Sequence, residues 1–416
     1  MKKIFLGSLI CLLAAGSLYI YSENNPTQLN KADDKNATAE GIGALVRANN
    51  QFALDMYAEL VAENDSKNIF FSPYSISTAL AMTYEGARGT TADEMRSVFY
   101  FPESQTEHRA ASAAIYNKLN APRSNYTLRT ANALWVREDF PLLDTYTDVV
   151  SNYYRGNVVN LDFINETEAS RQTINAWVAD QTENRIKDLL EKGIIDAGTA
   201  LVLTNAVYFK GDWELQFDER LTTDEEFWVS PEETVQVPMM RLTGEESQFR
   251  YTEVDGIQVL ELPYQDDDLS MLVILPPESG LRELQRELTV EQLSAWRTAL
   301  AVQQVDVFLP RFTFEDKLDL KEQLSTLGMP TAFGTAADFS GMTGSGSLFI
   351  SKVIHQAFIK VNEEGSEAAA ATAVIMNELA VPITKVFRAD QPFIFAIQEN
   401  ETGAILFMGT VNNPIK

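Results

Sequence analysis

The chain has 416 residues, and its net charge of −26 results from 59 acidic and 33 basic side chains. Such a surface repels phosphate backbones and anionic lipid heads, which argues against nucleic acid as a partner and against membrane binding by the mature domain. The only cysteine, Cys11, lies in the N-terminal apolar run, and His108 and His355 are the only histidines. This inventory argues against a disulfide framework, thiol chemistry and a histidine-based metal centre.

The N-terminus has the pattern of a signal peptide. Two lysines precede an apolar stretch that begins at Ile4, and this order is typical of export signals. Residues 1–22 are therefore interpreted as a signal peptide, which predicts a secreted or periplasmic protein. The alternative is an uncleaved anchor at residues 4–21, because that stretch approaches the length of a membrane span. Residues 23–40 are expected to be a flexible polar leader.

The first half of the chain is dominated by helical patterns. Apolar residues recur at helical spacing within residues 44–64. Ser72 is a good N-cap and Pro73 fits the first helical position, so a second helix is expected to begin there. The capping-box sequence at residues 91–94 predicts the start of a third helix. A further amphipathic helix is predicted over residues 166–181.

Strand patterns dominate the second half. The predicted strands cover residues 126–137, 200–211, 270–276, 303–310 and 346–361. The end of the chain, residues 391–411, is predicted to form a hairpin that turns at residues 399–403. From residue 41 onward there is no linker composition, charge block or repeat. We therefore expect one α+β domain over residues 41–416.

No enzyme motif is present. HExxH and GxSxG are absent, as are the Walker and Rossmann glycine patterns. His355 lies in strongly structured surroundings, but no nucleophile motif accompanies it, so we interpret it as a hydrogen-bonded core histidine rather than a general base. The chain is not expected to be an enzyme or to hold a metal.

Four segments resemble the serpin family, in the family's order. They are "NIFFSPYSISTALAMTYEGARGTTADEM", "LVLTNAVYFKGDWELQFD", "VNEEGSEAAAATAV" and "FRADQPFIFAI". The resemblance spans about residues 41–416 and implies a fold of three β-sheets and about nine helices. It also implies an exposed reactive-centre loop at about residues 363–388.

The resemblance implies a suicide-substrate inhibitor of serine proteases. The target protease cleaves the loop and is acylated by it, and the N-terminal half of the loop then inserts into the central sheet as a new strand. The target protease is thus the implied partner, held in a covalent acyl complex. No cofactor is implied, and a monomer is expected.

The hinge of the loop is implied at Glu363 and Gly365. An inserted strand buries every second side chain, and one face would carry Ser366, Ala368, Ala370, Thr372 and Val374. None of these five is large or charged, so the face permits insertion. Without the resemblance, residues 366–369 would be read as the start of a surface helix with Ser366 as its cap.

The resemblance also implies two sites that control the sheet. A polar shutter beneath its centre matches Ser72, Ser75, Asn205 and His355. Hydrogen-bonded groups of this kind can exchange partners when strands separate. Trp213 matches the breach, the point where the loop first enters, although a plain core tryptophan has the same sequence pattern.

The family's spacing from Gly365 places the specificity residue at Leu379, followed by Ala380. Counting back from Gln391 leaves Met376, Glu378 and Val381 open. Leu379 suggests chymotrypsin-, elastase- or subtilisin-like targets. Two other hypotheses remain, a non-inhibitory serpin that acts as a carrier or chaperone-like protein, and an inhibitor of cysteine proteases through the same loop.

Overall fold

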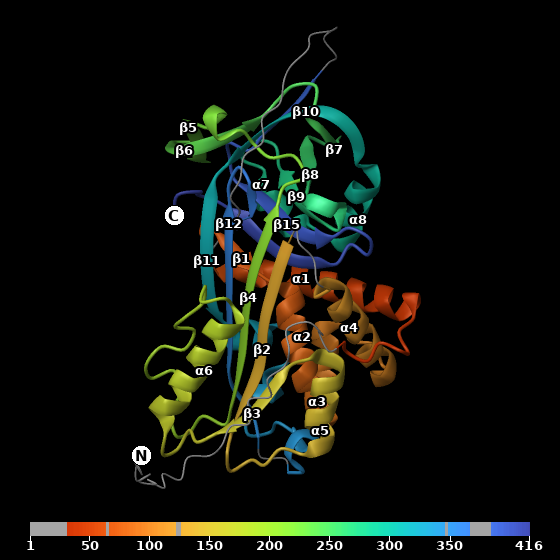
Figure 1. Ribbon diagram of the computed structural model, residues 1–416, viewed down its shortest axis with the longest axis vertical. Coiled ribbons are helices and arrows are strands. Elements are labelled where there is room, and N and C mark those ends of the chain that lie inside the picture. The colour runs from red at the N-terminus through yellow and green to blue at the C-terminus, as the bar shows by residue number, and fades with distance from the viewer. Residues whose placement is uncertain (1–30, 64–65, 122–125, 346–347, 367–383) are drawn as a thin grey trace, which may run out of the picture. The chain divides into compact units, whose positions relative to one another are not determined.

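The structure is a computed structural model that describes residues 31–63, 66–121, 126–345, 348–366 and 384–416. Within these ranges Lys31–Lys416 form one compact unit. The predicted signal peptide, residues 23–30 of the predicted leader and most of the reactive loop lie outside the described residues (Figure 1).

The compact unit begins before the boundary predicted at residue 41. Ala32 is only 3% exposed, and its N–H donates to Asn117 Oδ1 at 2.8 Å. The N–H of Asp33 donates to the carbonyl of Asn152 at 2.9 Å. The end of the segment assigned to a polar leader therefore packs against the domain.

The described residues contain ten α-helices. Their bounds are α1 (Ala39–Glu63), α2 (Pro73–Tyr84), α3 (Gly89–Phe99), α4 (Gln105–Leu119), α5 (Asp144–Val149), α6 (Thr167–Gln181), α7 (Leu281–Glu287), α8 (Val290–Ala299), α9 (Lys321–Leu327) and α10 (Ser340–Thr343). A π-helix, η1 (Val150–Tyr154), continues α5, and 3₁₀ turns lie at η2 (Glu219–Leu221), η3 (Gln265–Asp267) and η4 (Pro330–Phe333).

Helix starts follow the sequence signals at α2 but not at α3. Ser72 caps α2 by accepting a hydrogen bond from the N–H of Ser75, with Pro73 in the first turn. The capping box predicted at residues 91–94 is wrong, because α3 begins at Gly89 and its N-cap, Arg88, makes no side-chain bond. The Thr91 hydroxyl instead accepts from the N–H of Asp338 at 3.0 Å. The Thr91 side chain, which the sequence pattern predicted to cap the helix, therefore makes a tertiary hydrogen bond instead.

The strands form two hydrogen-bonded networks. The first has six strands in the order β11 (Phe312–Asp319), β12 (Ile350–Val361), β13 (Gly365–Ser366), β4 (Leu201–Asp212), β2 (Tyr126–Arg137) and β3 (Asn157–Leu161). The second has ten strands: β1 (Ile69–Phe71), β16 (Ile405–Val411), β15 (Phe393–Glu399), β9 (Leu269–Leu275), β8 (Ile257–Pro263), β7 (Gln248–Val254), β10 (Ala301–Pro310), β6 (Glu233–Leu242) and β5 (Thr223–Ser230), with β14 (Lys385–Arg388) pairing β10.

Strand β10 divides the ten-stranded network into two sheets. Residues 301–304 of β10 pair with β7, whereas residues 305–310 pair with β6 and β14. Together with the six-stranded sheet this gives three sheets, so the predicted α+β architecture is confirmed.

The six-stranded sheet is covered on both faces (Figure 1). Along β2, Leu134 and Val136 pack in a core shared with α1, α2 and α3, whereas Ala133 and Trp135 pack in a second core with α6. This alternation is expected because successive strand residues point to opposite faces. Side chains of β12 and β4 that point toward α2 are therefore enclosed, and polar ones among them need partners.

Candidate functional site

Five polar side chains meet beneath the centre of the six-stranded sheet. We call Ser72, Ser75, Asn132, Asn205 and His355 the shutter cluster. Each is 9% exposed or less. The structure thus brings together the four predicted shutter positions and adds Asn132.

His355 and Asn205 connect the two strands at the middle of the sheet. They are register partners in the parallel pairing of β12 with β4, which runs from Ile350 and Leu201 to Phe358 and Tyr208. His355 Nδ1 contacts Asn205 Oδ1. Asn205 Nδ2 donates to Ser75 Oγ and to Asn132 Oδ1. Asn205 therefore links β12 to β4, to α2 and to β2.

The start of α2 completes the cluster. The N–H of Ser72 donates to His355 Nε2 at 3.1 Å, and the Ser72 hydroxyl donates to the carbonyl of Leu406 at 2.7 Å. Because Nε2 accepts, the ring proton belongs on Nδ1, where it can be donated to Asn205 Oδ1. Burial lowers the pKa of His355 to about 3. His355 is a neutral hydrogen-bonding group, as predicted for a core histidine.

The hinge enters the sheet as a two-residue strand. In β13, Gly365 pairs with Asp212 and Ser366 with Gly211, while Ser366 also pairs with Val361 on the other side. Ser366 is fully buried, and its hydroxyl lies 2.9 Å from the hydroxyl of Tyr264. The first two residues of an added strand thus already lie between β12 and β4.

Only glycine fits at position 365. Its φ is +153°, and a Cβ atom there would lie 2.1 Å from the carbonyl oxygen of Gly211. The missing side chain lets the hinge backbone approach β4 closely enough to form the ladder.

Trp213 holds the backbone at the start of the hinge. Its indole N–H donates to the carbonyl of Asn362 at 3.0 Å, and its backbone N–H donates to the carbonyl of Glu364 at 2.9 Å. The ring stacks on Tyr264, with centroids 4.5 Å apart and planes at 13°. Trp213 and Tyr264 together form the buried floor where the loop enters, which is the place predicted for the breach.

Glu363 anchors the end of β12 by an ion pair. Its carboxylate accepts hydrogen bonds from Arg311 Nε at 2.7 Å and from the hydroxyl of Thr222. Burial acts to raise the pKa of Glu363, but these hydrogen bonds outweigh it and lower the pKa below its usual range. The backbone before the hinge is therefore fixed by a charge pair as well as by Trp213.

Sequence reasoning missed Asn132, Tyr264 and Arg311. An asparagine within the apolar run of residues 131–136 is a signal that could have found Asn132, because a polar side chain in a buried strand needs a partner. Tyr264 and Arg311 carry no such local signal. They join the site only because β8 and β10 end beside β13.

A sequence model of the family described as "Serpin (serine protease inhibitor)" matches residues 47–414. This chain belongs to the serpin family. A serpin-like protein of Methanosarcina acetivorans is 43% identical over 380 residues, which are 89% of this chain and 88% of that protein. The bovine leukocyte elastase inhibitor is 41% identical over 379 residues, covering 89% of this chain and 99% of the inhibitor. The solved structure of human thyroxine-binding globulin with thyroxine has a TM-score of 0.82 and 30% identity, over 90% of this chain and 99% of that one.

The remaining predicted positions of this serpin lie outside the described residues. They are Ala368, Ala370, Thr372 and Val374 of the insertion face, and Leu379 and Ala380 of the reactive bond. The described chain stops at Ser366 and resumes at Thr384, beside β14. In the described part of this serpin there is no group of three metal-ligating side chains.

Proposed function

We propose that this serpin is a suicide-substrate inhibitor of chymotrypsin-, elastase- or subtilisin-like serine endopeptidases. The observation that carries the proposal is β13. The first residues of the loop already lie between β12 and β4, with Ser366 paired on both sides, so the loop can become a full strand by continuing in the same register as β12 and β4 separate. The bovine inhibitor, at 41% identity, adds support for an elastase-like target.

The register of β13 tells where later residues would lie. In an antiparallel ladder one strand advances as the other recedes, so Ala368 would come opposite Phe209 and Ile359. Thr372 would come opposite Asn205 and His355, the pair that closes the centre of the sheet. Its hydroxyl can hydrogen-bond to both, in place of the bond that must break as β12 and β4 separate.

The proposed reaction stops at the acyl-enzyme. The protease serine attacks the carbonyl carbon of Leu379, the peptide bond to Ala380 breaks, and the new amine of Ala380 leaves with the proton. Leu379 then remains joined to the serine by an ester. Insertion carries this ester, with the protease, along the sheet before water can hydrolyse it.

A protease-complex assay tests the function. The serpin mixed with chymotrypsin or elastase should give a complex that survives denaturing electrophoresis, and a released fragment that begins at Ala380. The control is the same protease with its serine already blocked, which should give neither product. Nicking of the loop by every protease with full retention of protease activity would refute inhibition.

The same assay separates the alternatives. A complex with a cysteine protease and none with serine proteases would favour cross-class inhibition. The likeness to thyroxine-binding globulin favours a carrier as the second candidate, and a carrier should be nicked without trapping. A fragment that begins at Asn377, Leu379 or Pro382 would move the specificity residue from Leu379 to Met376, Glu378 or Val381.

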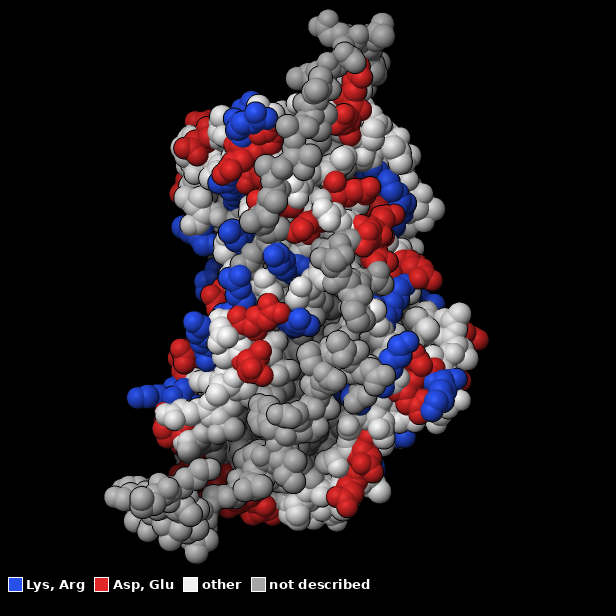
Figure 2. Space-filling model, viewed as in Figure 1, with Lys and Arg blue, Asp and Glu red and all other residues white. Residues whose placement is uncertain are grey.

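We also propose export directed by residues 1–22, with a monomeric mature domain that requires no cofactor. Lys, Arg, Asp and Glu side chains are interspersed on the described part of the face seen in Figure 2, and the net charge of −26 supports a partner other than nucleic acid. The described helices include none long and apolar enough to cross a membrane. N-terminal sequencing of the protein recovered from its producing cells would distinguish cleavage near residue 22 from an anchor at 4–21.

A further inference from the structure

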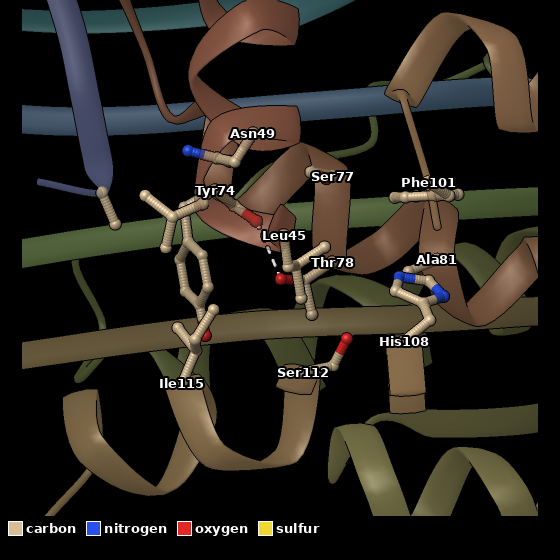
Figure 3. A pocket seen from close by; sticks show the side chains of 12 residues that line it. Leu45, Asn49, Tyr74, Ser77, Thr78, Ala81, Phe101, His108, Ser112 and Ile115 are labelled. Carbon is tan, nitrogen blue, oxygen red and sulfur yellow. Dashed lines mark hydrogen bonds between the residues drawn. The ribbon is translucent and has the colours of Figure 1, made fainter. Parts of the chain in front are cut away.

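A small pocket lies between α1, α2 and α4, outside the shutter cluster and the breach (Figure 3). Its volume is about 30 Å³. Leu45, Phe101 and Ile115 contribute apolar walls, whereas Asn49, His108 and Ser112 contribute polar atoms. A concavity of this volume has room for about two water molecules, or for a hydroxyl group and its nearest carbons.

His108 is the unusual member of this lining. It is fully buried, and neither ring nitrogen has a hydrogen-bond partner among the described residues. Figure 3 shows the ring extending from α4 toward Ala81 and Phe101. Since nearly all buried polar groups in proteins are hydrogen-bonded, a side chain like this one calls for an explanation.

Asn49 lines the same pocket at the end opposite His108 (Figure 3). Its Nδ2 donates to the carbonyl of Ile405 at 2.9 Å, but its Oδ1 has no partner in the part of the chain that the structure describes. The pocket therefore has a polar residue at each end, Asn49 from α1 and His108 from α4, with apolar side chains such as Leu45 between them.

The surroundings of His108 keep it uncharged. The rings of Tyr84, Phe101 and Tyr154 lie around it, the nearest with its centroid at 4.4 Å. The carboxylate of Glu85 already accepts hydrogen bonds from Arg109 at 2.6 Å and from the Tyr154 hydroxyl at 2.7 Å. Burial, together with the positive charge of Arg109, lowers the pKa of His108 to about 3. The neutral ring has one donor and one acceptor to offer.

We propose that this pocket binds a small uncharged molecule that carries a hydroxyl group on a short hydrocarbon. A hydroxyl can donate to the unprotonated ring nitrogen of His108 or accept from its N–H, and it brings no charge into the pocket. A charged head group would be buried without an opposite charge, because Arg109 and Glu85 already pair with each other. The volume restricts the inserted part to a hydroxyl and its nearest carbons.

Titration with 1-butanol, followed by NMR of the His108 ring protons, tests the proposal. We expect a saturable shift of these protons with 1-butanol, and at least tenfold weaker binding of butyrate, which has the same chain with a charged head. Equal binding of butyrate, or no saturable shift, would overturn the proposal. A crystal soaked in 1-butanol should show the alcohol oxygen within hydrogen-bond distance of a His108 nitrogen, and ordered water only at this place would also overturn it.

The variant His108→Phe keeps a ring against Phe101 and removes both nitrogens. It should lose the binding of 1-butanol at least tenfold, with binding followed by perturbation of the methyl signals of Leu45 and Ile115. Unchanged affinity would contradict the role of the imidazole. If this variant does not fold, Ser112→Leu serves in its place, since Ser112 lines the pocket beside His108 and a larger apolar side chain there should exclude 1-butanol in the same assay.

Discussion

His355 and Asn205 close the centre of the six-stranded sheet with side-chain hydrogen bonds instead of apolar contact. An apolar seam would lose its contacts outright when the strands separate, whereas these groups can change partners. Asn205 contacts β12, β2 and α2 through a single side chain. Asn205 should therefore have the largest effect on how readily β12 and β4 separate. Substitutions at Asn205 should change this separation more than substitutions at other positions between the two strands.

The two buried histidines make the free energy of unfolding depend on pH. The pKa of each is lowered from 6.5 to about 3 by burial, so the unfolded chain binds more protons between these values. The contribution of these neutral histidines to the free energy of unfolding is therefore fully present above about pH 6.5. It decreases as the pH falls toward 3, by up to about 1.4 kcal/mol per pH unit for each histidine. Urea unfolding measured between about pH 7 and pH 5 should show this decrease.

The variant His108→Phe provides the control. One titrating group is removed, so the pH slope of the unfolding free energy between about pH 6 and 5 should fall by about 1.4 kcal/mol per unit. Equal slopes for the variant and the parent would mean that His108 is not held neutral in the fold.

Residue-level prediction succeeded where a family motif or a local rule applied. Ser72 has its capping role because serine followed by proline specifies a helix start. Arg311 could not be predicted, because its pairing with Glu363 depends on where β10 ends in space. The side chains outside the described residues, including Leu379, remain predictions from the sequence alone.

At the scale of elements, β13 fixes which face of the loop must be small. Ser366 points into the core under the sheet, and in a strand the residues two and four positions later share its face. Replacing Ala368 by Arg should therefore slow insertion more than about tenfold, because burial of an unpaired charge costs several kcal/mol. The protease assay should then show cleaved serpin and active protease in place of the complex.

The same substitution one residue later is a matched control. By the register of β13, Ala369 would come opposite Tyr208 and Phe358 on the other face, and a guanidinium can stack on such rings. Ala369→Arg should therefore retain complex formation. Equal loss of inhibition in both variants would refute the assignment of faces.

Charge on the outer face leads to a separate prediction. Continuing the register of β13 brings Glu367 between Lys210 and Lys360, and opposite charges at such cross-strand positions contribute about 0.2–1 kcal/mol. Glu367→Lys should reduce the rate of trapping by severalfold, and the additional change Lys360→Glu should restore part of it. Stopped-flow measurement of trapping would check both, and an unaffected rate in the single variant would contradict this register.

Element bounds show what local sequence can and cannot specify. The strand predicted at residues 126–137 is β2 (Tyr126–Arg137), because its alternation and β-branched residues agree with its place in the sheet. At α3 the capping box failed because Thr91 bonds to Asp338, a residue far away in the sequence. Short β13 could not be predicted at all, since two residues become a strand only between β12 and β4.

For the whole molecule, the proposed function predicts a gain in stability when the loop is cut. Insertion would add a strand hydrogen-bonded on both sides, and each new backbone hydrogen bond contributes about 1 kcal/mol. The cleaved protein should therefore melt at a clearly higher temperature than the intact one, as measured by circular dichroism. An unchanged melting temperature would favour the carrier hypothesis.

The overall architecture could be predicted because four motifs far apart in the sequence resemble one family in the right order. Composition and periodicity alone led only to one α+β domain. They did not reveal that β10 belongs to two sheets, because its division depends on which strands end beside it. The packing of Ala32 and Asp33 against the domain could not be predicted either, since both residues make their contacts with residues distant in the chain.

In the proposed insertion, the two residues of β13 would change which step limits the rate of strand addition. Starting a new strand is ordinarily its slowest stage, because backbone freedom is lost before many hydrogen bonds form. Gly365 and Ser366 are already paired in the structure, so in the proposed insertion the rest of the strand would extend from a fixed end. In the proposed mechanism the rate of extension should then depend on how fast β12 and β4 separate, and Asn205 and His355, which join these strands at the centre of the sheet, should set that rate.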